Sequence, residues 1–340
     1  MRALAIFLAL VFGASAVSAQ QQTPPNKIQP TQDKPAQVKP TKPAASKPVS
    51  KIQLRGKLAA GSLVIGQTVP GSTVKLNDKP LAIAADGSFV FGFGRDYAGV
   101  AALEAAFPDG GIERREFKIA KRGYPIQRID GLPPKLVEPD PETMARIEKE
   151  YLLIVEARKV RSDLPFYKTG FIWPSQGRIS GIYGSQRILN GKPSRPHYGV
   201  DVAAGPGAPI VAAAAGTVTL VHSDMYFTGQ TVMVDHGMGV STLYIHMSAI
   251  AVSQGETVKQ GQLLGRVGST GRSTGPHLHW GLNWFDESLD AGLLVGLPAY
   301  PLALKPETGT WDFPVRGQRM MARPPPPQPV MQPPQPPAKL

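Results

Sequence analysis

The chain of 340 residues contains no cysteine and only six histidines, and both facts restrict its chemistry. Without cysteine the chain has no disulfides, no thiolate metal sites and no thiol nucleophile. The helical zinc motif H-E-x-x-H is also missing. After residue 19, no apolar run approaches the roughly 20 residues that a membrane-spanning helix needs. The six histidines are therefore the first place to look for a metal or catalytic site.

The overall composition fits folded domains with many turns. The hydrophobic fraction is 42% and the charged fraction 18%, and 36 glycines and 35 prolines favour turns over long helices. The net charge of +12 is compatible with nucleic-acid binding, but no basic stripe alternates with aromatic residues, so we expect no nucleic-acid partner. Anionic polymers or lipids of a cell envelope suit this charge better.

The first 19 residues predict an export signal that is removed. Arg2 precedes the apolar run 3–11, and residues 17–19 (VSA) are the small residues typical of a cleavage site. An uncleaved membrane anchor is the alternative, but the run is short for a bilayer. We therefore expect an exported protein of the periplasm or cell envelope, with no transmembrane segment in the mature chain. Residues 20–51, rich in proline and lysine, predict a disordered linker.

Residues 52–120 predict a small β-sandwich. Phe89, Phe91 and Phe93 alternate along one strand, and turn pairs such as Pro70-Gly71 and Asp86-Gly87 separate the apolar runs. The segment weakly resembles bacterial immunoglobulin-like modules. It contains no catalytic constellation, so we expect it to position or space the rest of the chain.

Residues 121–170 predict a linker with one helix over about 141–162. Asp140 is a suitable N-cap, and Pro141 suits the first helical position. Residues 171–304 are again rich in short apolar runs and glycine turns, which predicts a second β-rich domain. Residues 305–340 predict a solvated tail, rich in proline from residue 323. The fold class expected is thus mainly β, with two β domains and one connecting helix.

All six histidines lie between residues 197 and 279. In an extended segment His197 and Asp201 point to the same face, and so do His277 and His279, roughly 6–7 Å apart. Zinc accepts nitrogen and oxygen ligands, and a catalytic zinc site uses three protein ligands and leaves one position open. Spacing alone leaves open whether His277 and His279 both bind the metal or only one does.

Three segments carry a resemblance to a known family. They are RPHYGVD (195–201), LYIH (243–246) and GSTGRSTGPHLH (268–279), and they resemble the lysostaphin/LytM-type zinc metalloendopeptidases. The resemblance implies an antiparallel sheet that forms a groove, and one Zn²⁺ held by His197, Asp201 and His279. It also implies His246 and His277 as the catalytic pair, and peptide cross-links of peptidoglycan as the substrate.

The chain departs from the family pattern after the last motif. Trp280-Gly281 stands where relatives often have Phe-Glu, and the apolar stretch 282–297 replaces a short turn. Both differences are expected to alter the wall of the groove rather than the five chemical residues.

Two other readings compete with an active zinc enzyme. Gly271-Arg272-Ser273-Thr274-Gly275 matches the G-x-S-x-G pattern of serine hydrolases, but no acid lies between Ser273 and the two histidines that follow it. A family member without activity, which regulates other wall hydrolases by contact, is the second alternative. Because both catalytic histidines and all three ligands are present, we favour the enzyme, with an envelope regulatory protein as a further partner.

Overall fold

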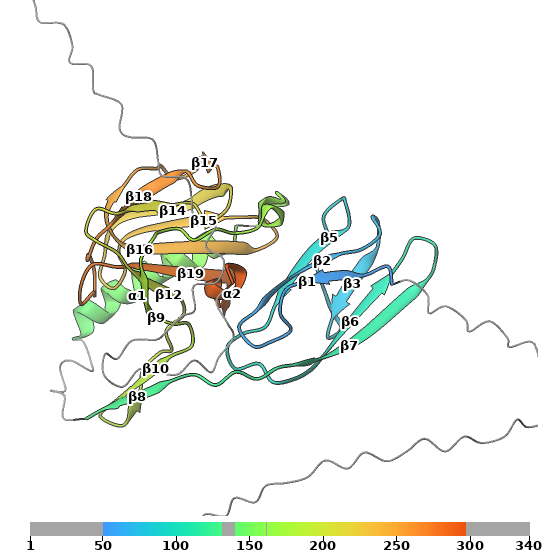
Figure 1. The fold of residues 1–340 in the computed structure, drawn as a ribbon, viewed down its shortest axis with the longest axis horizontal. Helices are drawn as coiled ribbons and strands as arrows, with labels where there is room; N and C mark the ends of the chain where they lie inside the picture. The colour runs from blue at the N-terminus through green and yellow to red at the C-terminus, as the bar shows by residue number, and fades with distance from the viewer. Residues whose placement is uncertain (1–49, 131–139, 161, 297–340) are drawn as a thin grey trace, which may run out of the picture. The chain divides into compact units, whose positions relative to one another are not determined.

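The structure is a computed structural model that describes residues 50–130, 140–160 and 162–296. Within these ranges strands predominate, and most pair antiparallel (Figure 1). The prediction of a mainly β protein is therefore confirmed. The predicted signal peptide, the tail from residue 305 and nearly all of the predicted linker 20–51 lie outside the described residues.

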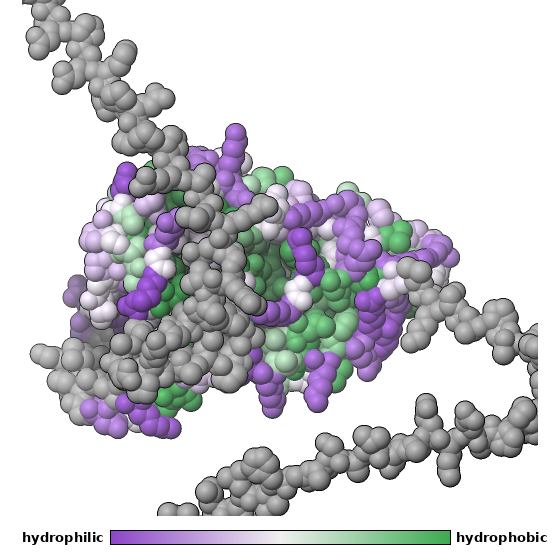
Figure 2. Space-filling model, viewed as in Figure 1, coloured by the Kyte–Doolittle hydropathy of each residue, from purple (hydrophilic) through white to green (hydrophobic). Residues whose placement is uncertain are grey.

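Two antiparallel sheets form a sandwich over residues 52–120. One sheet has the order β1-β2-β5 and the other β4-β3-β6-β7, and they enclose one apolar core. The strands are β1 (Gln53–Arg55), β2 (Leu63–Gln67), β3 (Thr73–Leu76), β4 (Lys79–Pro80), β5 (Ser88–Gly92), β6 (Gly99–Ala106) and β7 (Ile112–Ile119). Figure 2 shows hydrophilic side chains along its outer edge. The immunoglobulin-like kinship and the domain limits stay predictions.

Strand β5 is buried on both faces. Phe89 and Phe91 of β5, and Phe93 directly after it, point into the sandwich core, as their alternation predicts. Val90, only 3% exposed, points the other way and packs with the apolar core of the following β region, as does Leu63 of β2. These two strands thus lie between two cores, and the sandwich is packed against the second β region.

The connecting helix α1 (Pro141–Arg158) begins as predicted and ends four residues early. The Asp140 side chain accepts a hydrogen bond from the Thr143 backbone N–H, 2.9 Å away, as an N-cap does. The predicted end of the helix is at about residue 162, but Ser162 makes tertiary contacts instead of helical ones. Its hydroxyl donates to the Asp235 carboxylate, and its carbonyl accepts from the Met238 N–H at 2.8 Å.

The predicted linker 121–170 contains a strand before α1 and a short helix after it, neither of which its composition predicts. Strand β8 (Ile126–Ile129) pairs in parallel with β10 (Gln186–Leu189), which also pairs with β11 (Lys192–Pro193). A short 3-10 helix, η2 (Phe166–Thr169), follows α1. The Tyr167 hydroxyl in η2 lies 2.9 Å from the Ser88 hydroxyl of β5.

The second β region is built on one large sheet with the central order β17-β14-β15-β16-β19-β12-β9. Strands β18 and β20 pair with β16 and β19, and β13 pairs with β18. The elements are β9 (Arg178–Gly181), β12 (Val200–Ala203), β13 (Pro209–Val211), β14 (Gly216–Met225), β15 (Gly229–Asp235), β16 (Val240–Ile250), β17 (Thr257–Val258), β18 (Leu263–Val267), β19 (Leu278–Trp284), β20 (Glu287–Leu289) and α2 (Ala291–Leu294).

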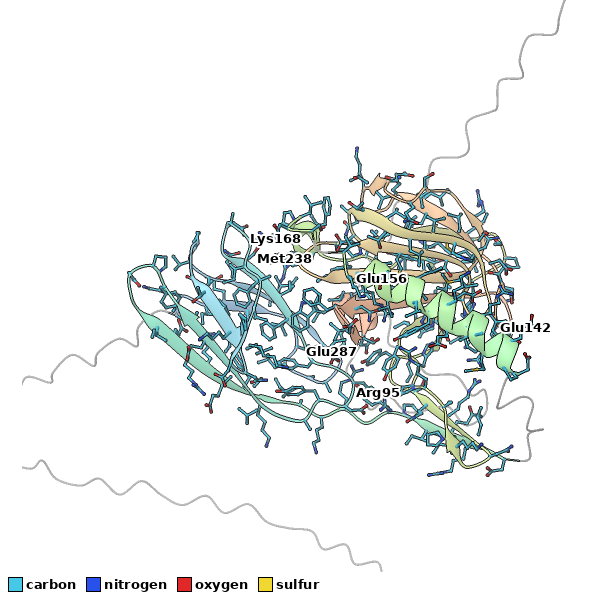
Figure 3. The ribbon with its side chains drawn as sticks, turned by 180° about the vertical axis from the view of Figure 1, so that it is seen from behind. Arg95, Glu142, Glu156, Lys168, Met238 and Glu287 are labelled. Atoms are coloured by element: carbon cyan, nitrogen blue, oxygen red, sulfur yellow. The ribbon has the colours of Figure 1, made fainter. Side chains whose placement is uncertain are left out.

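Helix α1 covers part of one face of this sheet (Figure 3). Ile154 and Ala157 of α1 pack with Leu243 and Ile245 of β16, while Tyr244 points into the core on the opposite face. The sheet is therefore apolar on both sides where α1 covers it. No helix in the described part of the chain is long and apolar enough to cross a membrane.

Candidate active site

Strand alternation places Asp201 and His279 side by side on the face of the sheet that α1 also occupies. In β12, Val200 and Val202 enter the core and leave Asp201 on the other face. In β19, Leu278 and Trp280 do the same for His279. Asp201 and His279 are direct partners in the β12–β19 register, and residues opposite each other share a face.

His197 completes this group from the loop before β12. Its Nε2 lies 3.0 Å from Asp201 Oδ1 and 2.9 Å from His279 Nδ1. Its other ring nitrogen, Nδ1, donates to the Ile182 carbonyl at 2.9 Å. That hydrogen bond fixes the tautomer and leaves a lone pair on Nε2, as a metal-ligating histidine requires.

The three side chains have the geometry and charge of a metal site. Tetrahedral ligands at about 2.0–2.1 Å from one ion lie roughly 3.3 Å apart, close to the 2.9–3.0 Å between the His197, Asp201 and His279 atoms. Burial alone would raise the pKa of Asp201, but His197 and His279 hold it well below its usual value, so the carboxylate is charged. The donor set of two imidazoles and a carboxylate suits Zn²⁺.

His246 reaches the site through an irregularity in β16. Ile245 is the register partner of His279, so regular alternation would send His246 into the core beside Leu278. Instead, His246 has φ = 63°, in the left-handed region that non-glycine residues seldom occupy, and the pairing of β16 shifts around it. Its ring lies 4.7 Å from the ring of His277, between centroids.

His246 is held as a neutral base. Its Nδ1 donates to the Thr270 carbonyl at 2.8 Å, which leaves the Nε2 lone pair available. Burial lowers the pKa of His246 to about 4, so the ring is uncharged at neutral pH. A strained backbone that aims a neutral imidazole at a metal-compatible group is a feature of functional sites.

His277 is held by the loop that precedes it. Its Nδ1 donates to the Gly275 carbonyl at 2.8 Å, and its Nε2 lies 3.9 Å from Asp201 Oδ1. The second nitrogen therefore faces the ligand group without joining it as closely as His279 does. His279 thus lies closer to Asp201 than His277 does, and the assignment of His279 as ligand and His277 as catalytic neighbour stays a prediction.

Ser273 has no geometry suited to a nucleophile. Its hydroxyl donates to the Gly275 carbonyl at 2.8 Å and lies 3.3 Å from His277 Nδ1. Since His277 Nδ1 donates to the same carbonyl, it cannot also accept the serine proton. The serine-hydrolase reading therefore has no support in the contacts of this loop.

His236, although fully buried, belongs to the core rather than to the site. Its ring nitrogens lie 2.7 Å from the Ala215 carbonyl and 2.7 Å from Thr242 Oγ1. The residues that sequence reasoning missed are those that orient the histidines through backbone carbonyls, namely Ile182, Thr270 and Gly275. No side-chain pattern reports a carbonyl acceptor, so only their place in the motif-bearing segments could have suggested them.

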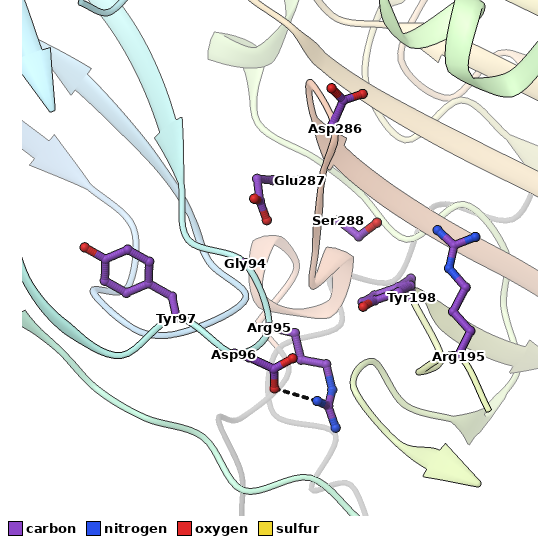
Figure 4. A pocket seen from close by; sticks show the side chains of 9 residues that line it. All are labelled: Gly94, Arg95, Asp96, Tyr97, Arg195, Tyr198, Asp286, Glu287 and Ser288. Atoms are coloured by element: carbon purple, nitrogen blue, oxygen red, sulfur yellow. Dashed lines mark hydrogen bonds and ion pairs between the residues drawn. The ribbon is translucent and has the colours of Figure 1, made fainter. Parts of the chain in front are cut away.

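A polar cleft of about 430 Å³ lies between the sandwich and the second β region (Figure 4). Arg195 and Tyr198 line it on one side, and Arg95, Asp96 and Glu287 line it on others. None of the five site residues lines this cleft. The polar residues 286–288, which follow β19, border the cleft, and the next residue, Leu289, packs against Gly92 of the sandwich. Leu289, within the apolar stretch that begins at residue 282, thus contacts the sandwich.

Comparison with known proteins agrees with this site. The model of peptidase family M23 matches residues 195–291, which include all five site residues. The DD-carboxypeptidase/endopeptidase Mpg of Neisseria meningitidis is 49% identical over 103 residues, 30% of this chain and 24% of that protein. The peptidoglycan DD-endopeptidase ShyA of Vibrio cholerae is 38% identical over 109 residues, 32% of this chain and 25% of its own. The chain thus spans about a quarter of the length of these curated relatives.

One solved structure matches well beyond the M23 segment. A peptidase M23 from Pseudomonas aeruginosa is 29% identical, with a TM-score of 0.55, over 71% of this chain and 96% of its own. The similarity therefore covers more of the fold than residues 195–291. The resemblance carried by the three sequence motifs is thus confirmed for residues 195–291, which match the model of peptidase family M23.

Proposed function

We propose that this protein is an exported zinc endopeptidase that hydrolyses peptide cross-links of peptidoglycan. The observation that carries the proposal is the convergence of His197, Asp201 and His279 on one point, with His246 and His277 beside them. The names of the matched relatives, which are DD-endopeptidases of peptidoglycan, support the substrate class. The predicted signal peptide supports action outside the cytoplasm.

Each of the five residues has a distinct role in the proposed reaction. His197, Asp201 and His279 would hold one Zn²⁺, and the carboxylate would offset part of its charge. When bound, the ion supplies Lewis-acid chemistry, which polarises a carbonyl and lowers the pKa of water to about 7. His246 accepts a proton at Nε2, because burial keeps its ring neutral and Thr270 fixes its Nδ1–H.

His277 completes the proposed pair. Its Nδ1–H is fixed by the Gly275 carbonyl, so its Nε2 is the atom that faces the reacting centre. A ring in that position can stabilise a developing oxyanion or return a proton to the leaving amine once it is protonated. The two rings lie 4.7 Å apart, close enough to act on one substrate group.

Digestion of purified sacculi by the purified protein tests the proposal. Cross-linked muropeptides should decrease and monomers increase, with no new reducing sugar ends. Chelation should abolish the activity and added Zn²⁺ should restore it, whereas H279A should stay inactive. Intact cross-links after digestion by a zinc-loaded wild type would overturn the proposal and favour the regulatory alternative.

A further inference from the structure

The loop over residues 268–276 positions both proposed catalytic histidines. The Thr270 carbonyl accepts from His246, and the Gly275 carbonyl accepts from His277. Arg272 lies between these two attachment points, two residues from Thr270 and three from Gly275. The Arg272 side chain therefore belongs to the same loop that positions His246 and His277.

Arg272 is held rigidly by the loop between β14 and β15. Its guanidinium carbon lies 4.1 Å from the centre of the Phe227 ring, and its backbone N–H donates to the Phe227 carbonyl at 3.0 Å. The backbones of the two segments are in close contact next to Arg272, since a Cβ added at Gly271 would lie 2.4 Å from the Gly229 nitrogen. Stacking on an aromatic ring covers one face of the guanidinium plane. The N–H groups at its edge are then available to donate hydrogen bonds to a ligand.

Among the described residues, Arg272 has no acidic partner. Other arginines of the chain do have one, for example Arg95 with Asp96, Arg115 with Glu113, and Arg122 with Asp290. Another cation, Arg187 of β10, acts electrostatically on both Arg272 and His197. The single carboxylate of the metal-compatible group, Asp201, is already engaged by His197 and His279, so it does not serve as a counterion for these cations.

We propose that Arg272, stacked on Phe227, binds a free carboxylate of the peptide substrate close to the scissile amide and so selects anionic peptides. This inference rests on the proposed endopeptidase function. A guanidinium forms two parallel hydrogen bonds with a carboxylate, and a preoriented one loses little entropy when it binds. Arg187 adds positive potential, because it acts electrostatically on both Arg272 and His197.

Kinetics on paired substrates test the proposal. The substrates are a cross-linked muropeptide dimer and the same dimer with its carboxylates amidated. R272Q should raise KM for the carboxylate dimer by roughly 10–100-fold, with a smaller change in kcat, and should leave the amidated dimer unaffected. R272K, which keeps the charge but loses the planar fork, should recover part of the loss. R266Q is the matched control, because the Arg266 side chain, on β18, donates to the Gly207 carbonyl and forms no ion pair among the described residues.

Binding provides a readout that does not need turnover. Calorimetry with chelator-treated wild type and R272Q should show weaker binding of the carboxylate dimer to the variant, and equal binding of the amidated dimer. Equal affinity of both proteins for both dimers would overturn the assignment of Arg272, even if the wild type cleaves cross-links. Tighter binding of the carboxylate dimer to wild type, without any cleavage by zinc-loaded protein, would keep the assignment and reject the endopeptidase function.

Discussion

Arg122 and Asp290 form an ion pair in which both side chains are almost fully buried, with 2.7 Å between Nη2 and Oδ2. Arg122 follows the last strand of the sandwich and also donates to the Ala60 carbonyl. Asp290 is the N-cap of α2, directly after β20. This pair joins the sandwich to the region that carries the candidate active site.

Removal of one partner should destabilise the whole protein. Arg122→Ala leaves the Asp290 carboxylate buried without its counterion, so we expect a loss of about 3–5 kcal/mol in the free energy of unfolding. Urea denaturation measures this. R114A is the matched control, because Arg114 forms only exposed ion pairs and should cost less than about 1 kcal/mol. The double variant R122M/D290N, which removes both charges, should regain part of the loss.

Zinc content and rate should separate the histidines by role. H279A should lose metal and activity together. H246A and H277A should keep near-stoichiometric zinc while losing about 10²–10⁴-fold in rate, the usual range for a positioned acid or base. Elemental analysis beside turnover of muropeptides measures both. A metal-free H277A together with a zinc-loaded H279A would reverse the assignment of these two residues.

A substitution at Gly229 tests whether the loop 268–276 must keep its position for catalysis. A Cβ added there would lie 2.2 Å from Thr270 Oγ1 and 2.5 Å from the Thr270 carbonyl carbon, so G229A must displace the loop that holds His246. We expect at least a tenfold loss of kcat, since misplacing a catalytic group by about 1 Å can cost roughly 100-fold.

Gly255 provides the control for that substitution. It has a similar left-handed φ of 87°, but an added Cβ meets no atom within 4 Å. G255A should therefore cost only the backbone strain, about 1–2 kcal/mol of stability, and leave kcat unchanged. Equal kcat values for G229A and G255A would show that the loop tolerates displacement.

His236 should make stability depend on pH. Burial lowers the pKa of this ring to about 4, whereas the unfolded chain takes up its proton near 6.5. Between these values the unfolded state binds more protons, so stability falls as pH falls, by about 3 kcal/mol in total from this residue. Urea denaturation of wild type and H236Q at several pH values measures it. The two proteins should differ most above pH 6.5 and progressively less towards pH 4, and a constant difference would contradict the prediction.

The sequence by itself determined the fold class and most of the site. Val200 and Val202 on either side of Asp201, and Leu278 and Trp280 on either side of His279, fix which face each strand buries. The burial of these apolar neighbours leaves Asp201 and His279 on the opposite face. The helix start at Asp140 was likewise predictable, because capping is decided within one turn.

Only the tertiary structure decided the position of His246 and the place of the sandwich. Regular alternation would place the His246 side chain in the core. The left-handed backbone conformation of His246 redirects this side chain, and it is held by hydrogen bonds to the Thr270 and Thr228 carbonyls, which other segments supply. The end of α1 and the packing of Val90 depend in the same way on residues distant in the sequence. Local pattern fixes which face a side chain prefers, whereas partners brought together by folding decide where the backbone departs from that pattern.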